Sequence, residues 1–285
     1  MCQFCVQHGE GKKWYLQAKN YARELVEERR QLLEGALRAD FPLNTLEDQF
    51  LADPRGALST LFNQGEPISG DLSDFRAQVK ERMLLFHYGQ VVPLEDAEAI
   101  LDHAVSVVRL PCICRSALLG QRDARFCYGF ITFEDAWWPK KGELPRPDLA
   151  PELEVLTVAE AKEAFRRHDR DALVHQVYTI ATPFILGICN CTTRDCVNLR
   201  ARAELGLELY FKGEYLATID QEQCTGCREC MSACNFGAIS YSSSLDRCLV
   251  NVFQCAGCGL CRAACHTGAI GLRDRLSVPA VADNW

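Results

Sequence analysis

Cysteines in the C-terminal third of the chain are spaced in a way that can hold iron. Two runs, CTGCRECMSACNFGAI and CAGCGLCRAACHTGAI, both read C-x₂-C-x₂-C-x₃-C. The first run supplies Cys224, Cys227, Cys230 and Cys234, and the second supplies Cys255, Cys258, Cys261 and Cys265. A tight loop with a thiolate at every third position can wrap three irons of a [4Fe–4S] cube. The fourth cysteine, expected to begin a short helix, reaches the other cube.

This exchange of fourth ligands divides the cysteines into two expected sets. Cluster one is expected to use Cys224, Cys227, Cys230 and Cys265. Cluster two is expected to use Cys255, Cys258, Cys261 and Cys234. Structural zinc sites more often show two separate C-x₂-C pairs than two runs of four, so this spacing favours iron–sulfur clusters over zinc.

On these residues, about residues 207–275 resemble a bacterial-type ferredoxin domain with two [4Fe–4S] clusters. Each fourth cysteine is followed after two residues by Gly-Ala-Ile, as in that family. The resemblance implies two cubes and transfer of single electrons to a partner protein. Two features depart from the family. Asn235 and His266 stand where it usually has proline, and the longer link between the halves contains Cys248, which we expect to be a free thiol.

Six further cysteines lie between the N-terminal region and the ferredoxin-like part: Cys112, Cys114, Cys127, Cys189, Cys191 and Cys196. Four of them form two Cys-x-Cys pairs, in RLPCICRSAL and ILGICNCTTRDC, and each pair ends an apolar run rich in β-formers. Because residues i and i+2 of a strand point to the same face, each pair can present both thiols together. The helix expected near 194–204 has Cys196 in its first turn, where the helix dipole favours a thiolate.

Packing in a core is the alternative explanation, because free cysteine often behaves as a small buried apolar residue. Six such residues beside two cluster motifs favour ligation of a further iron–sulfur cluster by a subset of them, with zinc as the alternative. Arg115 and Arg194 flank the pairs and can stabilise a negatively charged thiolate group. More loosely, the chain resembles larger ferredoxin-domain proteins of anaerobes that carry a Cys-x-Cys-Arg element and a later cysteine-rich stretch.

The N-terminus adds a partial metal site in MCQFCVQH, formed by Cys2, Cys5 and His8. It is one ligand short, and Cys127 or a thiol of a Cys-x-Cys pair can complete it. A floppy, exposed cysteine pair is the alternative. Counted with the six, these thiols can hold two cubes, or one cluster and a second metal ion. We find no nucleophile elbow, P-loop or complete dinucleotide motif, so no catalytic residue is assigned.

Three regions must position these residues: a mainly helical region at 1–104, an α/β cysteine-rich unit at 105–205 and the ferredoxin-like domain at 206–285. This organisation predicts an α+β fold. In the first region, apolar spacing predicts helices over 14–37, after Asp71, and from Pro93 to about 104.

Residues 105–190 combine β-rich runs with one short helix. The runs are VSVVRLPCIC and ALVHQVYTIATPFILGIC, and a capping box of Thr157 and Glu160 opens the helix between them. The proline-rich stretch 137–152 is expected to be a surface loop that covers Trp137 and Trp138.

Composition excludes several classes of protein. The 285-residue chain is 48% hydrophobic and has a formal charge of −7. No apolar run is long enough to cross a membrane, and the start lacks the apolar core of a signal peptide, so we expect a cytoplasmic protein without membrane insertion. In that compartment the 17 cysteines point to metal or redox chemistry rather than disulfides. The charge distribution shows no basic stripe for nucleic acid and suits a basic patch on a redox partner, such as an oxidoreductase.

The sequence thus predicts an iron–sulfur electron-transfer protein with two [4Fe–4S] clusters and at least one further cluster. Two alternatives stay open. The extra site can be the reaction centre of a reductase or enzyme component, or it can hold a structural zinc ion in a module that docks a partner. The oligomeric state, the potentials and the partner are not fixed by the sequence.

Overall fold

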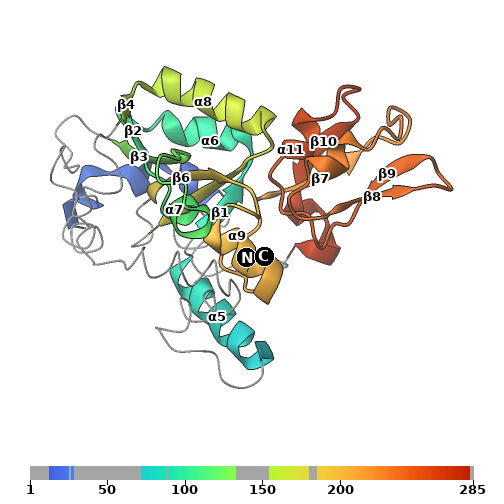
Figure 1. Ribbon diagram of the computed structural model, residues 1–285, viewed down its shortest axis with the longest axis horizontal. Coiled ribbons are helices and arrows are strands. Elements are labelled where there is room, and N and C mark those ends of the chain that lie inside the picture. The colour runs from blue at the N-terminus through green and yellow to red at the C-terminus, as the bar shows by residue number, and fades with distance from the viewer. Residues whose placement is uncertain are drawn as a thin grey trace.

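The computed structural model describes residues 13–28, 72–132, 154–179 and 185–282, apart from Val26 and Tyr88. These residues form an antiparallel sheet covered by helices, followed by a C-terminal part with two small two-stranded sheets. Figure 1 shows the sheet unit on one side and the orange-to-red C-terminal part on the other. Helices and mainly antiparallel strands in one chain confirm the predicted α+β class.

The large sheet has six strands in the order β1-β5-β6-β3-β2-β4. Their bounds, in chain order, are β1 Gly89–Val92, β2 Ser106–Leu110, β3 Cys127–Ile131, β4 Glu154–Leu156, β5 Val174–Thr179 and β6 Ile185–Cys191. Strand β1 comes from the region expected to be helical, yet it pairs with β5 along its whole length. Residues on the two sides of position 104 therefore belong to the same sheet.

The two faces of this sheet bury different residues because side chains alternate along each strand. On one face, Tyr128, Val177 and Ile188 form an apolar core with Phe165. That core includes helices α6 (Leu94–Leu101) and α8 (Val158–Arg170). On the other face Cys127 of β3 lies directly opposite Cys189 of β6. Helices α7 (Ile113–Leu119) and α9 (Val197–Leu205) lie on this second side of the sheet in Figure 1.

Several predicted helices are present where their start signals lie. Helix α5 (Leu72–Phe86) begins after Asp71, and α6 begins at Leu94 with Pro93 as its N-cap. The capping box is complete in α8, where the Thr157 side chain accepts from Glu160 N and Glu160 accepts from Thr157 N. These starts were predictable because capping is a local interaction.

The prediction of a single helix over 14–37 is wrong at its beginning. The chain forms two 3₁₀ turns there, η1 (Trp14–Leu16) and η2 (Ala18–Tyr21), and the stretch beyond residue 28 is outside the described residues. Trp14 Nε1 donates to Gln90 Oε1 over 2.8 Å, and the Tyr15 hydroxyl donates to Asp96 over 2.8 Å. These fully buried contacts override the helical periodicity of the sequence.

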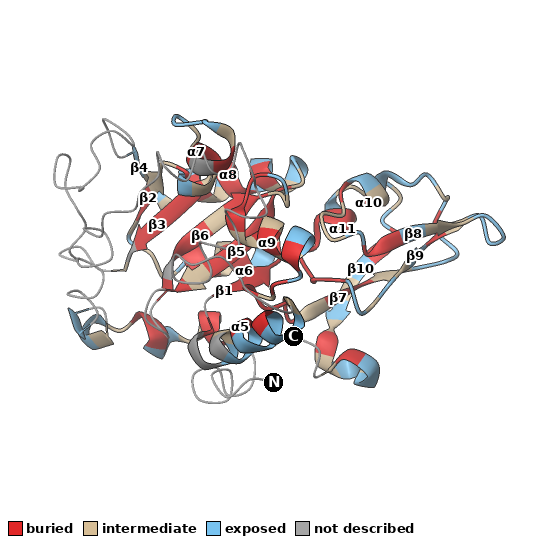
Figure 2. Ribbon diagram, turned by 60° about the horizontal axis from the view of Figure 1, so that its bottom comes forward, coloured by how far each residue is buried: buried red, intermediate tan, exposed pale blue. Residues whose placement is uncertain are grey.

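The C-terminal part repeats one small unit twice. Its elements are β7 (Tyr215–Ile219), α10 (Glu229–Ser232), β8 (Ile239–Ser242), β9 (Arg247–Val250), α11 (Leu260–Ala263) and β10 (Ile270–Asp274), followed by η3 (Arg275–Ser277) and η4 (Pro279–Val281). Strand β7 pairs with β10, and β8 pairs with β9 in a hairpin that projects from the body in Figure 2. Cys234 and Cys265 follow the short helices, so the expectation that they begin helices is wrong.

Hydrogen bonds join the sheet unit to the C-terminal part. Phe211 N donates to Gly89 O over 2.9 Å, and Val91 N donates to Phe211 O over 3.0 Å, so the incoming chain runs beside the edge strand β1. Among the described residues, no helix is both long and apolar enough to cross a membrane.

Candidate metal centres

The cysteines expected to bind cluster one surround a single cavity. Cys224, Cys227, Cys230 and Cys265 line it, together with Thr225, Thr267 and Cys248. Cys224 and Cys265 come from opposite ends of the C-terminal part. The fold therefore brings the fourth cysteine of the second run to the cysteines of the first run. We call this the first cluster cavity.

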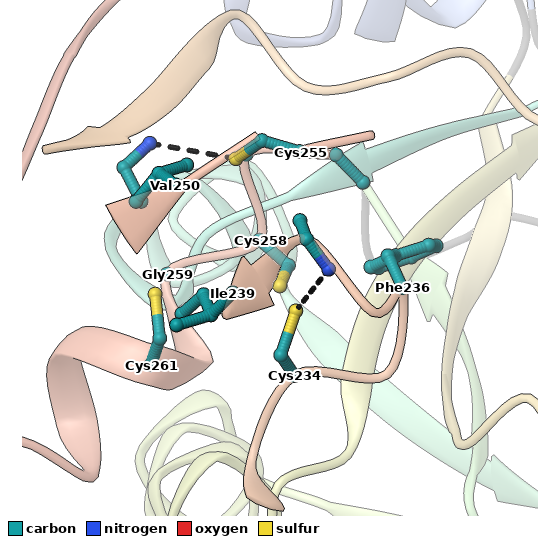
Figure 3. A pocket seen from close by; sticks show the side chains of 12 residues that line it. Cys234, Phe236, Ile239, Val250, Cys255, Cys258, Gly259 and Cys261 are labelled. Atoms are coloured by element: carbon teal, nitrogen blue, oxygen red, sulfur yellow. Dashed lines mark hydrogen bonds between the residues drawn. The ribbon is translucent and has the colours of Figure 1, made fainter. Parts of the chain in front are cut away.

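The second expected set surrounds a separate cavity, which we call the second cluster cavity (Figure 3). Its thiols belong to Cys234, Cys255, Cys258 and Cys261, and Phe236 lines it beside them. Backbone amides point at two of the sulfurs: Ala238 N donates to Cys234 Sγ over 3.2 Å, and Ala217 N donates to Cys255 Sγ over 3.5 Å. Four thiols with N–H donors around one hollow match the chemistry of a thiolate-bound cube.

The loop around the second cluster cavity depends on a glycine. Gly257 has φ +74°, and a Cβ on it would lie 2.3 Å from the carbonyl oxygen of Tyr215. Only glycine combines this left-handed conformation with so close an approach of two backbones. The tight turn lets the cysteines on either side of it face the same hollow.

The two cavities differ in how much solvent they meet. The loop of the first cavity is open, and Cys227 is exposed next to Glu229 and His266. His266 Nδ1 lies 3.1 Å from Glu229 Oε2, so this departure from the family sits on the surface. Burial raises the pKa of Cys265, but hydrogen bonds from Thr267 and from backbone amides outweigh burial, and the net shift is downward. By contrast, residues 255–261 of the second cavity are all buried.

Asn235, the other departure from the family, connects the first motif to the sheet unit. Its Nδ2 donates to Ala172 O over 2.8 Å, and its Oδ1 accepts from Thr193 N over 3.3 Å. A proline at this position has no side-chain donor or acceptor for either bond. The unusual asparagine is therefore part of the interface between the two halves of the molecule.

Two other residues bear on the cavities in ways the motifs do not reveal. Cys248 is 1% exposed and lines the first cavity against Cys230, where burial and the Cys248 contact raise the pKa of Cys230 to about 12. Arg275 is fully buried, and its guanidinium donates to the carbonyl oxygens of Gly213, Tyr215 and Cys255 at 2.8–3.0 Å. The sequence gives no sign of this role beyond the position of Arg275 just after β10.

The six remaining cysteines of the sheet unit lie together on one face of the large sheet. We call this group the six-thiol site: Cys112, Cys114, Cys127, Cys189, Cys191 and Cys196. Strand β3 supplies one thiol, β6 supplies two, and the starts of α7 and α9 supply the rest. Segments that are far apart in the sequence thus bring these cysteines together, as expected from the two Cys-x-Cys pairs.

The sulfurs of the six-thiol site form two chains of contacts. In the first, Cys127 Sγ lies 3.6 Å from Cys112 Sγ and 3.6 Å from Cys189 Sγ. In the second, Cys196 contacts both Cys114 and Cys191. The chains are close enough for electrostatic coupling between Cys114 and Cys127. The group is therefore a single site with more thiols than one tetrahedral ion requires.

The prediction that both Cys-x-Cys pairs lie on strands is right for only one of them. Cys189 and Cys191 are on β6 and share a face. Strand β2 ends at Leu110, Cys112 is the N-cap of α7, and Cys114 lies in its first turn. Pro111 follows the strand directly, and proline cannot donate to a sheet. Helix α9 begins at Val197, three residues later than predicted, so Cys196 is its N-cap and not a residue of its first turn.

Polar groups around the six-thiol site favour negative charge. Phe126 N donates to Cys112 Sγ over 2.8 Å. Arg115 is buried, pairs with Asp195 at 2.8 Å and lies 4.1 Å above the Phe126 ring. Arg194, the other arginine expected to flank the site, is exposed. One buried cation therefore accompanies the thiols.

Without a metal ion the thiols of this site hold their protons at neutral pH. Hydrogen bonding with Cys127 and then burial raise the pKa of Cys112. A hydrogen bond with Cys127 lowers the pKa of Cys189, but burial and neighbouring thiols outweigh it and raise the pKa to about 12. Burial disfavours a lone thiolate, whereas a bound metal ion replaces the proton and stabilises the same sulfur.

The six-thiol site adjoins the second cluster cavity. Cys191 and Cys196 belong to one buried apolar group with Val91, Ala256 and Cys258, and Phe236 packs against that group. Cysteines of the two sites therefore pack in the same apolar group. The expected partial site at Cys2, Cys5 and His8 lies outside the described residues, as do Trp137 and Trp138.

Comparison with known proteins bears on the C-terminal part. Residues 216–266 match the family model described as a 4Fe-4S dicluster domain, a range that contains both C-x₂-C-x₂-C-x₃-C runs. No curated protein matches the chain. The molecule therefore contains a ferredoxin-type iron–sulfur domain that occupies its C-terminal part, joined to a sheet unit with a cysteine site of its own.

Proposed function

We propose that the protein is an iron–sulfur electron-transfer protein with two [4Fe–4S] clusters in its ferredoxin-type domain and a further cluster in the six-thiol site. The dicluster match supports the first two clusters. The observation that carries the third is the convergence of six free thiols beside the second cluster cavity. Bound clusters supply single-electron redox chemistry, and the cysteines supply thiolate ligands and shape.

The number and overall spread of the six sulfurs, more than their closest contacts, favour a polynuclear cluster over a zinc ion. Four thiolates at about 2.3 Å from one tetrahedral ion lie about 3.8 Å from one another, and the 3.6 Å contacts of Cys127 with Cys112 and Cys189 are close to that spacing. Among the described residues, however, the only three ligand side chains with atoms mutually within 4.8 Å are Cys227, Glu229 and His266, so no three of the six thiols are grouped as a single ion requires. A cube core of iron and sulfide fills a wider space between its thiolates than one ion does.

The exposure of the sites suggests the order in which electrons move. The loop of the first cluster cavity is open to a partner protein, whereas that of the second is buried against the sheet unit. An electron that enters near Cys227 would reach the second cluster and then the six-thiol site. The free thiols of the described residues suit a reducing compartment such as the cytoplasm, and the redox partner would be an oxidoreductase.

One observation favours a second candidate function, a reductase component whose six-thiol site is the reaction centre. The site has two thiols more than a single cube requires, and Cys114 and Cys189 are only partly buried. A metal that ends the electron path and is partly exposed would be where substrate binds. Binding of cyanide or carbon monoxide to the reduced protein, detected as a changed EPR signal of the third cluster alone, would favour this candidate.

The test replaces ligands of the six-thiol site in protein purified without oxygen. We expect Cys112→Ala/Cys189→Ala to lose one EPR signal and its share of the iron, and to keep the two ferredoxin signals, which also report that the chain is folded. Ser106→Ala, on β2 and outside the three sites, is the control that we expect to leave all three signals intact. Unchanged iron and EPR signals in the double variant would contradict a third cluster, and loss of one zinc ion would replace it with a structural clip.

A further inference from the structure

A buried amide beside the six-thiol site has no partner. Gln176 of β5 is 0% exposed, and neither its Nε2 nor its Oε1 makes a hydrogen bond within the part of the chain that the structure describes. Leaving such a group unpaired is destabilising, and natural proteins rarely tolerate it without a reason. The side chain is therefore positioned for a group that is not part of the polypeptide.

The strand register places Gln176 between the six-thiol site and the residues that pack against the second cluster cavity. It lies directly opposite Cys189 on β6 and directly opposite Val91 on β1. Residues directly opposite one another share a sheet face, and the next position in this row is Cys127, whose sulfur contacts Cys189. On the other side, Val91 packs in the same apolar group as Cys258 of the second cluster cavity. The amide thus belongs to the cysteine face of the sheet.

The neighbouring residue of the strand lies on the opposite face of the sheet. His175 points the other way, its Nδ1 lies 2.6 Å from Asn190 Oδ1, and its Nε2, which makes no hydrogen bond, lies 3.6 Å from Asp169 Oδ1. On the cysteine side, a second donor lacks a partner, because Arg115 Nε is buried without a hydrogen bond. Two unpaired donors near six thiols suit a group that is rich in sulfur and negatively charged.

We propose that the Gln176 side-chain amide donates a hydrogen bond to a sulfur of the cluster held by the six-thiol site and raises its reduction potential. The proposal rests on the proposed function, since it requires a cluster there. A reduced cluster carries one more negative charge than an oxidised one, so an N–H donor stabilises the reduced form more. Gln176 is a positioning and tuning residue, and the cysteines remain the ligands.

Gln176→Met tests this with a side chain of similar length that has no donor. In an anaerobic potentiometric titration followed by EPR, we expect the third signal to shift to a more negative potential. The expected shift is about tenfold in the reduction equilibrium, or about 59 mV for one electron. Iron content and the two ferredoxin signals should not change. Gln121→Met, an exposed glutamine of the same unit, is the control that should leave all three potentials unchanged.

A second measurement on the unaltered protein keeps the test decisive if Gln176→Met loses the cluster. Protein labelled with ¹⁵N in glutamine side chains should show a ¹⁵N coupling to the third signal in electron–nuclear double resonance. Absence of that coupling in the wild-type protein, or an unshifted potential in the variant, would overturn the role of Gln176 and leave the third cluster standing. Absence of any third signal would overturn both.

Discussion

At the scale of single residues, Asn235 connects a cysteine motif to the sheet unit. It stands directly after Cys234 and makes two hydrogen bonds to the sheet unit. We predict that Asn235→Ala weakens the interface by about 1–2 kcal/mol, since each neutral hydrogen bond contributes about 0.5–1.5 kcal/mol. The second cluster should then bleach at a lower temperature, measured by visible absorbance without oxygen.

The repeat supplies a matched control for this prediction. His266 occupies the same position in the other motif but is exposed and contacts Glu229. His266→Ala should leave the bleaching temperature close to that of the wild type. Equal effects of the two substitutions would show that Asn235 acts by its place in the motif and not through the interface.

Arg275 is the second residue whose importance the motifs do not reveal. It holds three backbone carbonyls at the base of the second cluster cavity. We predict that Arg275→Met lowers the free energy of unfolding by about 3 kcal/mol, about 1 kcal/mol for each hydrogen bond lost. Anaerobic urea titration followed by tryptophan fluorescence measures this. Arg273→Met, an exposed arginine two residues earlier on β10, should have almost no effect, and a similar loss there would contradict the account.

At the scale of elements, the six-thiol site depends on how closely β3 and β6 approach. Gly187 of β6 lies opposite Gly129 of β3, two residues from the Cys127–Cys189 pair. A Cβ on Gly187 would lie 2.2 Å from the Tyr128 carbonyl oxygen. We predict that Gly187→Ala forces the strands apart and reduces the iron bound at the six-thiol site to less than half, without loss of the ferredoxin signals.

Gly271→Ala is the control for this element. Gly271 lies in β10, where an added Cβ would meet the Thr218 hydroxyl at 3.4 Å, an ordinary contact. Iron content should stay at the wild-type level in this variant. Full iron content in Gly187→Ala would show that the strand spacing does not control the site.

Elements also show where sequence reasoning reaches its limit. The capping box of α8 and the shared face of Cys189 and Cys191 depend on neighbouring residues, so local patterns predicted them. The same logic failed for Cys112 and Cys114, because it ignored that Pro111 ends the strand. At Trp14, tertiary contacts replaced a helix by 3₁₀ turns, which no local pattern reveals.

At the scale of the whole molecule, the grouping of cysteines into the two ferredoxin cavities could be predicted because the repeat itself carries it. The strand order could not, since β1, β5 and β6 come together from distant parts of the chain. Gln176 and the packing of Cys258 against the sheet unit depend on that order. Ligation by any of these cysteines stays a prediction, as does the partial site at the N-terminus.

Several contacts hold the second cluster cavity beside the sheet unit. Cys258 of the second cluster cavity packs in one apolar group with Cys191 and Cys196 of the six-thiol site, and Glu95 of α6 holds Arg262 of α11 by two contacts of 3.0 and 2.6 Å. Because that ion pair is partly exposed, its contribution to stability is small, about 0–1 kcal/mol. Apolar packing and the Asn235 contacts therefore hold the second cluster cavity against the sheet unit.

The measurement that tests the central claim most directly is iron, zinc and acid-labile sulfide analysis of anaerobically purified protein, combined with EPR spin quantitation after full reduction. Two ferredoxin cubes account for about eight irons per chain, four for each cube. The account predicts about twelve irons or more, matching sulfide, and a third spin system. About eight irons and two spin systems would contradict it, and a stoichiometric zinc ion beside them would identify the six-thiol site as a structural clip.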